Sequence, residues 1–325
     1  MGEKELAIKS GEIKTSPKAN SFYENLPSEE ELFKRIRLTN EFVWENKLKK
    51  QEIEKWLSNF KGDVFEVQYE RQLALWLLSN FVYYNNNEVR HLCKTLFRNF
   101  IHQMLSEKNT EELDIKIALE SILHTTKFCH LGNTGESGAF ILYFFRQENN
   151  LSLENFISNP IKLPESVNTI VFVDDVTISG TQAYDYFGQK IDSDEDYTKI
   201  LLTLISTDEA VQLLGENNIR VISCINLDER SKCFSRNSNL FQDCKDKIQD
   251  CKKFAMMYGS KSLLHHDVSM HPLGHNGGEY AFGFFYNTPD NTLPIFWADN
   301  KGWSPVMKRY EKLNRRTYDQ FGRFI

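Results

Sequence analysis

Two adjacent carboxylates, Asp174 and Asp175, stand in the middle of the chain between an apolar run and a turn of small polar residues. The apolar run, 170–173, is bulky and mostly β-branched, which is typical of a strand buried on both faces of a parallel sheet. The turn at 179–181 precedes a possible helix over 182–187, whose first N–H groups would have no partner within the helix. Such a helix start attracts anions.

The two acids suit a different chemical group. Like charges repel, so a carboxylate pair does not hold a phosphate, but it accepts hydrogen bonds from vicinal hydroxyl groups. Both acids would also stand at the carboxyl end of the strand, where open α/β sheets bind ligands. A diol beside a phosphate describes a ribose 5-phosphate.

The stretch over 170–182 resembles the phosphoribosyl-pyrophosphate (PRPP) motif of type I phosphoribosyltransferases, in which an apolar strand runs into two acids, a hydrophobic residue and a Thr/Ser/Gly loop. The resemblance implies that Asp174 and Asp175 face the ribose 2- and 3-hydroxyls. It also implies that the following loop holds the 5-phosphate through backbone N–H groups and hydroxyls. This ribose 5-phosphate loop comprises Thr177, Ile178, Ser179, Gly180, Thr181 and Gln182.

Ile178 departs from the family pattern, since purine-salvage members carry at this position an Asp proposed as a general base and others carry Thr. The departure argues against base-assisted chemistry on a purine. Without the resemblance, the same stretch reads as a buried strand that ends in an Asp-rich turn.

A glycine-rich stretch, 132–138, lies just before the apolar run 139–145, which fits a strand with Arg146 at its far end. Its glycines allow the positive φ angles of an N–H nest, which suits the pyrophosphate or base side of such a site, although a flexible hairpin explains them equally well. Glu136 opposes simple anion binding unless a metal intervenes. Mg²⁺ carried in by the pyrophosphate is therefore the expected cofactor, held by few protein ligands. The candidates on this side are Gly135, Ser137, Gly138 and Arg146.

Three further features have competing interpretations. Asp228 follows a candidate strand at 220–227 and is another candidate for the pyrophosphate or base side, but the residue types favour a solvated turn. The aromatic run 285–297, around a polar turn, either sandwiches a base or fills the core. Histidines that could gather a transition metal are interrupted by a proline and a glycine, so we predict no protein metal centre; they are His265, His266, His271 and His275.

The scaffold that must position these residues is predicted to be α/β. Candidate strands and helices alternate along the second half of the chain, which favours a doubly wound, mainly parallel sheet of the type I phosphoribosyltransferase kind over 125–325. The strands are expected at 139–145, 170–176, 199–205, 220–227 and 280–286, with a helix over 208–214 and a helix or helical hairpin over 233–257.

The first part of the chain shows a different pattern. Residues 1–27 are polar and Lys-rich without periodicity, as expected of a flexible arm. Residues 28–124 read as a helical region, with a capping box at Ser28 and Glu31 and its clearest helix over 87–105. Asp63 and Glu66 suggest a second capping box.

The composition limits the class of protein. A chain of 325 residues with 41% hydrophobic content is globular, and a net charge of −6 provides no overall basic field for nucleic acid. Six cysteines without C-x-x-C spacing, together with no signal peptide or membrane-length apolar run, indicate a cytoplasmic protein with reduced thiols and no membrane partner.

A wider resemblance covers roughly residues 50–310. The Trp56 helix, the 132–138 loop, the motif at 173–181 and the Asn-Thr-Pro and Leu-Pro pattern over 287–297 look like the phosphoribosyltransferase-like proteins of bacterial conflict systems, some encoded beside retrons as antiphage effectors. The resemblance implies nucleotide or PRPP chemistry at the ribose anomeric carbon. It also implies a regulatory protein or nucleoprotein partner in an oligomer or larger assembly. The alternative is a catalytically inactive ribose-phosphate sensor or scaffold subunit, which the Ile178 departure favours.

Overall fold

The structure, a computed structural model, describes residues 26–107, 115–133, 135–158, 160, 163–191, 197–264, 271–300 and 302–310. The predicted N-terminal arm, 1–27, lies outside these ranges except for its last two residues.

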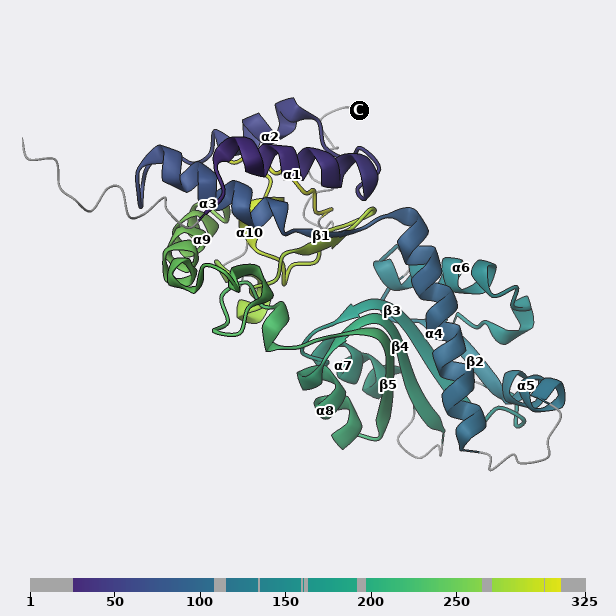
Figure 1. Ribbon diagram of the computed structural model, residues 1–325. Helices are drawn as coiled ribbons and strands as arrows, with labels where there is room; N and C mark the ends of the chain where they lie inside the picture. The colour runs from purple at the N-terminus through teal and green to yellow at the C-terminus, as the bar shows by residue number, and fades with distance from the viewer. Residues whose placement is uncertain are drawn as a thin grey trace, which may run out of the picture.

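A four-stranded parallel sheet forms the middle layer of the lower body in Figure 1. The strands follow the order β2 (Thr126–His130), β3 (Thr169–Thr177), β4 (Thr198–Thr207) and β5 (Ile219–Leu227). β3 pairs with a strand on each side, and its apolar half is fully buried. The predicted α/β fold with a mainly parallel sheet is confirmed. Parallel strands need crossover connections, and helices provide them here.

Helices cover both faces of this sheet. Val171 and Val173 of β3 point toward α4 (Asn86–Ser106) and α6 (Ser137–Glu148), whereas the alternate residues Ile170 and Phe172 pack toward α7 (Thr181–Lys190) and α8 (Asp208–Glu216). The period of two along a strand produces this division. α5 (Ile115–Thr125) precedes β2. We call residues 85–228 the sheet lobe.

The remaining elements form a second body, which we call the helical lobe, from residues 26–84 and 229–310 (Figure 1). It contains α1 (Glu29–Phe42), α2 (Lys50–Leu57), α3 (Val67–Ser79), α9 (Ile248–Ser262) and α10 (Pro294–Trp297). β1 (Val82–Tyr84) and β6 (Phe282–Phe284) pair as a two-stranded parallel sheet. Single 3-10 turns occupy Leu153–Asn155, Glu229–Ser231, Asn239–Phe241, Lys245–Lys247 and His275–Gly277.

The hydrophobic cores do not follow the predicted division at residue 124. The first three helices share a core with residues 233–307, in which Trp56 stacks on Phe296 at 5.8 Å and 18°. α4 packs instead on the sheet, together with residues of β6. Segments from both ends of the chain therefore build the helical lobe, and the residues that flank β6, Ala281 and Phe285, pack on its core.

Several local predictions can be compared with the structure. The Ser28 capping box forms, with Ser28 Oγ accepting the Glu31 N–H at 3.3 Å, and the helix expected over 87–105 is α4. The strand expected over 139–145 is wrong: this run is α6, with Ile141, Phe144 and Phe145 buried. A short apolar run fits either element, and spacings of three and four let α6 bury one side.

Other element boundaries also differ. The strand expected over 280–286 is limited to the three residues of β6, and the helix expected over 233–257 begins only at Ile248. The second capping box does not form, because Glu66 itself is the N-cap of α3 and makes no side-chain cap bond. All six cysteines lie in the described residues and are free. Among the described helices, none has the length and apolar character needed to cross a membrane.

Candidate functional site

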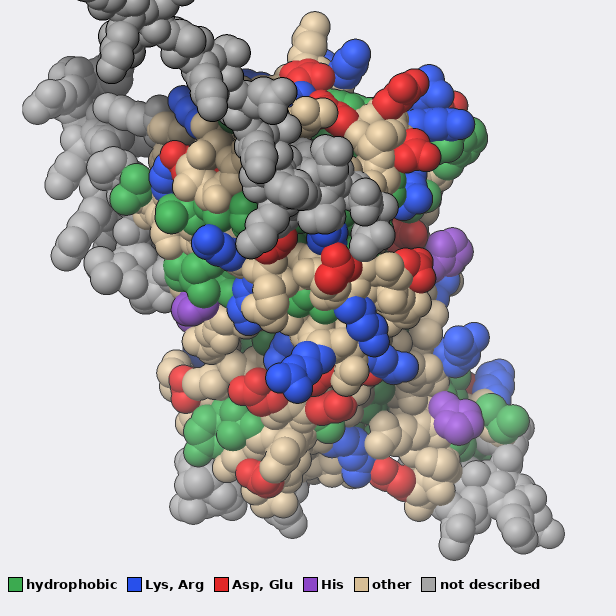
Figure 2. Space-filling view, turned by 60° about the vertical axis from the view of Figure 1, so that its left-hand side comes forward, with side chains coloured by type: hydrophobic (Ala, Val, Ile, Leu, Met, Phe, Trp, Pro, Cys, Tyr) green, Lys and Arg blue, Asp and Glu red, His purple; other side chains and the backbone are tan. Residues whose placement is uncertain are grey.

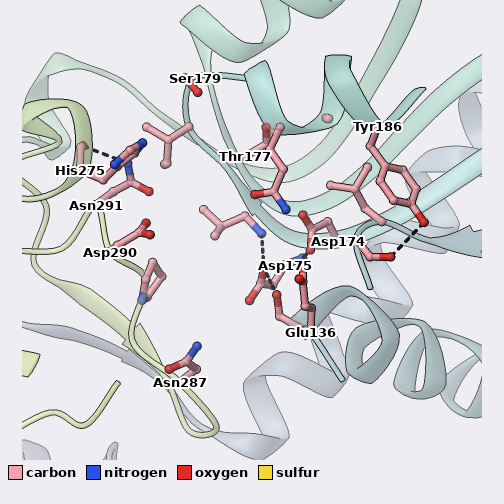
Figure 3. A pocket seen from close by; sticks show the side chains of 18 of the residues that line it. Glu136, Asp174, Asp175, Thr177, Ser179, Tyr186, His275, Asn287, Asp290 and Asn291 are labelled. Atoms are coloured by element: carbon pink, nitrogen blue, oxygen red, sulfur yellow. Dashed lines mark hydrogen bonds between the residues drawn. The ribbon is translucent and has the colours of Figure 1, made fainter. Parts of the chain in front are cut away.

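A cavity of about 1010 Å³ opens at the carboxyl ends of β2 and β3, where the two lobes meet. Figure 3 shows its two walls: Asp174, Asp175 and Thr177 come from the sheet lobe, and His275 and Asp290 face them from the helical lobe. Carboxyl strand ends are where α/β sheets bind ligands. The topology thus makes this cavity the candidate site.

The two aspartates lie on the cavity wall and are almost fully buried, with relative exposures of 7% and 6%. The Asp175 carboxylate accepts the Ser137 hydroxyl at Oδ1 and the Tyr286 hydroxyl at Oδ2, both at 3.0 Å. Asp174 Oδ1 accepts the backbone N–H of Asp175 at 2.9 Å. The pair is therefore fixed by α6, by β3 itself and by the segment after β6.

Burial raises the pKa of Asp174 well above its ordinary range, and the neighbouring Asp175 carboxylate raises it further. Burial raises the Asp175 pKa as well, but the hydrogen bonds from Tyr286 and Ser137 act in the opposite direction. Asp174 is consequently the acid that takes up a proton more readily, while Asp175 is better prepared to carry the charge.

The predicted ribose 5-phosphate loop surrounds the start of α7. All six of its residues line the cavity, and Gly180, the N-cap of α7, has a left-handed φ of 77°. Thr207 Oγ1 of β4 donates to the Ile178 carbonyl at 2.5 Å and ties the loop to the sheet. The structure therefore brings the loop and both aspartates to one cavity, with the N-terminus of a ten-residue helix at one side.

Gly180→Ala is expected to destabilise the protein by about 1–2 kcal/mol, because L-residues pay for a left-handed conformation. A Cβ there would also lie 3.2 Å from the Ala210 Cα of α8. Urea unfolding measures the loss, and a ribose 5-phosphate titration should show several-fold weaker binding.

Gly215→Ala is the matched control for this variant, since Gly215 lies in α8 and a Cβ there meets nothing within 4 Å. The control is expected to be neutral or slightly stabilising. Equal effects of the two substitutions would contradict a conformational role of Gly180.

The glycine-rich stretch precedes a helix and not the predicted strand. Gly135 and Ser137 line the cavity. Gly138 lies behind them in the first turn of α6, where a Cβ would come within 2.3 Å of the Leu131 carbonyl oxygen. Tyr186 of α7 donates its hydroxyl to the Gly132 carbonyl at 2.9 Å, so this stretch is connected to the phosphate side.

Two predicted site residues are not brought to the cavity. Arg146 lies in the last turn of α6, at the opposite end of that helix from Ser137, and is not among the residues that line the cavity. Asp228 caps a 3-10 turn and forms an ion pair with Arg230 at 2.7 Å. The alternative interpretation of Asp228, a solvated turn, describes what the structure shows.

The helical lobe contributes Tyr286, Asn287 and Asn291 from the aromatic run 285–297 to the cavity, together with Tyr310, which no sequence pattern singled out. Arg309 binds the Thr288 carbonyl at 2.9 Å and the Asp290 carboxylate at 3.0 Å, and so holds the polar turn in place. The aromatic residues beyond this turn, Phe296 and Trp297, are buried in the core. The only available signal was the polar turn itself; nothing near Tyr286 in the sequence points to Asp175.

Carboxylate oxygens on the cavity wall are the ligands that hard divalent cations prefer. Glu136 also lines the cavity and adds its negative charge to that around Asp174. Within the described residues, however, no group of three or more His, Cys, Asp or Glu side chains is arranged to hold a metal ion. His265 and His266 lie outside the described residues.

Comparison with known proteins identifies the family. The family model PRTase-CE matches residues 53–309, which is well over half of the chain. Similar solved structures include the orotate phosphoribosyltransferase of Aeropyrum pernix, with 16% identity, 33% of this chain and 64% of that chain covered, and a TM-score of 0.24. Another is the UMP synthase of Leishmania donovani, with 12% identity, coverage of 63% and 41%, and a TM-score of 0.29.

The chain thus spans less than two thirds of either of these proteins, and no curated protein sequence matches it significantly. The family match extends over both lobes and includes the acid pair and the loop that follows it. The chain belongs to the PRTase-CE family and is a phosphoribosyltransferase-like protein.

Proposed function

We propose that the cavity binds PRPP or a related ribose-phosphate nucleotide and that the protein catalyses substitution at the anomeric carbon. The observation that carries this proposal is the placement on one cavity wall of two buried acids, in the carboxyl half of a single strand, and of the α-helix N-terminus that follows this strand. Hydroxyl acceptors beside N–H donors match the two polar ends of a ribose 5-phosphate.

The chemistry would pass through an oxocarbenium-like transition state as pyrophosphate leaves. Asp174 and Asp175 would orient the sugar through its hydroxyls, and the 177–182 loop would anchor its phosphate. Mg²⁺, when bound, would offset the charge of the leaving pyrophosphate. The acceptor is a base, a nucleotide or water, and Ile178 supplies no acid or base to activate it.

Release of labelled pyrophosphate from PRPP tests this proposal. Purified full-length protein with Mg²⁺ is expected to release pyrophosphate, and an excess of EDTA is expected to stop the release, because the leaving group then keeps its full charge. Tight PRPP binding without release would support the alternative, an inactive ribose-phosphate sensor or scaffold subunit, which Ile178 favours. Absence of both binding and release would refute the ribose-phosphate site.

The biological role that we propose is that of a cytoplasmic effector in bacterial antiphage defence, held silent by a protein or nucleoprotein partner. Its support is the resemblance over residues 50–310 to proteins of conflict systems. On the face seen in Figure 2, Lys and Arg side chains are interspersed with Asp and Glu, so this face offers no broad basic surface for nucleic acid. Phage plating on cells with wild-type protein or an Asp174→Asn, Asp175→Asn variant tests the role: equal plating would contradict it.

A further inference from the structure

The Asp175 carboxylate is already bound on both oxygens by the protein. Its Oδ1 accepts the Ser137 hydroxyl at 3.0 Å and the Val176 N–H at 2.9 Å, and its Oδ2 accepts the Tyr286 hydroxyl at 3.0 Å. An ionised carboxylate has about four acceptor positions. The Asp174 side chain also lies within hydrogen-bonding reach of Asp175, so at most about one acceptor position, on Oδ2, is left for a ligand hydroxyl. The three bonds therefore fix the direction from which a ligand hydroxyl can donate to Asp175.

Rigid neighbours hold the ring of Tyr286 in place. It stacks on Phe284 of β6 at 5.3 Å and 11°, and Phe140 of α6 packs on it at 4.8 Å. Phe284 in turn stacks on Tyr84 of β1, at 5.4 Å. Phe140 lies one turn after Ser137 on α6, so a single helix supplies one hydroxyl and supports the ring that carries the other. Side chains locked in this way give a preorganised site.

The Tyr286 hydroxyl stays protonated and therefore remains a hydrogen-bond donor to Asp175. Burial raises its pKa well above the ordinary tyrosine value, and the Asp175 carboxylate raises it further. The hydroxyl therefore keeps its single hydrogen, which is directed to Asp175 Oδ2. No loss of this bond through ionisation is expected at neutral pH.

We infer that Tyr286 and Ser137 are positioning residues, which aim the remaining acceptor position of Asp175 at one ribose hydroxyl and so make the cavity selective for ribose over deoxyribose phosphates. The inference rests on the proposed function. Because Tyr286 follows β6, which pairs with β1, this selectivity requires the helical lobe to be seated on the sheet lobe. A cavity built by the sheet lobe alone would lack it.

Calorimetric titration with three probes tests this inference: ribose 5-phosphate and its 2-deoxy and 3-deoxy analogues. Wild-type protein is expected to bind one deoxy analogue about tenfold or more weakly, because an acceptor aimed at the missing hydroxyl is left unpaired. Tyr286→Phe and Ser137→Ala are each expected to reduce that ratio below about threefold, since an unaimed carboxylate no longer distinguishes the sugars.

Tyr280→Phe is the matched control, because Tyr280 is a buried tyrosine of the same segment that is not among the cavity residues. It is expected to keep the wild-type ratio. An unchanged ratio in Tyr286→Phe, or tighter binding of ribose 5-phosphate by that variant, would overturn the positioning role while leaving the proposed function intact. If wild-type protein binds none of the three sugars, the proposed function itself fails. Should Tyr286→Phe not fold, Ser137→Ala decides between these outcomes.

Discussion

Exchanging Asp174 and Asp175 together for asparagine is expected to lower PRPP-dependent pyrophosphate release by at least about 100-fold. The two carboxylates are the buried acceptors on the wall that adjoins the phosphate loop, and an amide offers an N–H where the sugar hydroxyl needs an acceptor. The loss should appear in ribose 5-phosphate affinity as well, which calorimetry measures even if turnover is slow.

Asp185→Asn provides the control for general charge effects, since Asp185 also lines the cavity but is exposed on α7. This variant is expected to stay within about twofold of the wild-type activity, because an exposed charge is well screened. If the double variant kept wild-type binding and turnover, Asp174 and Asp175 would have no role in the site.

The buried Asp174 carboxyl is expected to lower the free energy of unfolding at neutral pH, where it must ionise. A folded-state pKa above the ordinary value means that folding favours the protonated Asp174. The stabilisation is complete below the ordinary pKa of about 4 and is lost as the pH rises through the raised folded-state value. Asp174→Asn should therefore melt at a higher temperature than wild type at pH 8, with the difference shrinking toward pH 4. A constant difference across this range would contradict the assignment of the raised pKa to Asp174.

Gly138→Ala is expected to destabilise the protein by about 2–4 kcal/mol. A Cβ at this position would lie 2.3 Å from the Leu131 carbonyl oxygen and 3.1 Å from that of Val173, both backbone atoms that no rotamer change can move. Helix α6 must then shift away from β2 and β3. Because Ser137 precedes Gly138, the shift also removes a hydrogen bond from Asp175, and ribose 5-phosphate binding should weaken together with stability.

Urea unfolding compares this variant with Gly188→Ala. Gly188 is likewise helical, in α7, but a Cβ there meets nothing within 4 Å. The control is expected to gain up to about 1 kcal/mol from the better helix propensity of alanine. A Gly138→Ala protein as stable as this control would show that α6 can move without loss, and that the close approach of α6 to the strands is not required.

Much of the site could be predicted because it is local in the chain. The strand, the two acids, the loop and the start of α7 follow one another within thirteen residues, so their mutual placement depends mainly on backbone geometry. The opposite wall could not be predicted. Tyr286 reaches Asp175 across 111 residues, and its neighbours in the sequence carry no sign of that contact.

The secondary-structure elements, too, depend partly on local sequence and partly on contacts with distant segments. Residues 139–145 fit a strand or a helix by pattern, and the choice depended on burial of Ile141, Phe144 and Phe145 between α4 and the sheet. The glycine at 138 looked like part of a loop, yet it is needed where α6 touches two strand ends. In both cases partners distant in the chain decided the outcome.

The amino-acid sequence by itself determined the α/β class, the central buried strand and the join of acids to phosphate loop, because neighbouring residues encode periodicity, capping and turn chemistry directly. Only the tertiary structure decided how the cavity is closed and how Asp175 is oriented. Those features depend on the packing of the helical lobe, in which residues from both ends of the chain meet. No local pattern encodes such contacts, since their energy arises from burial between segments that are distant in sequence.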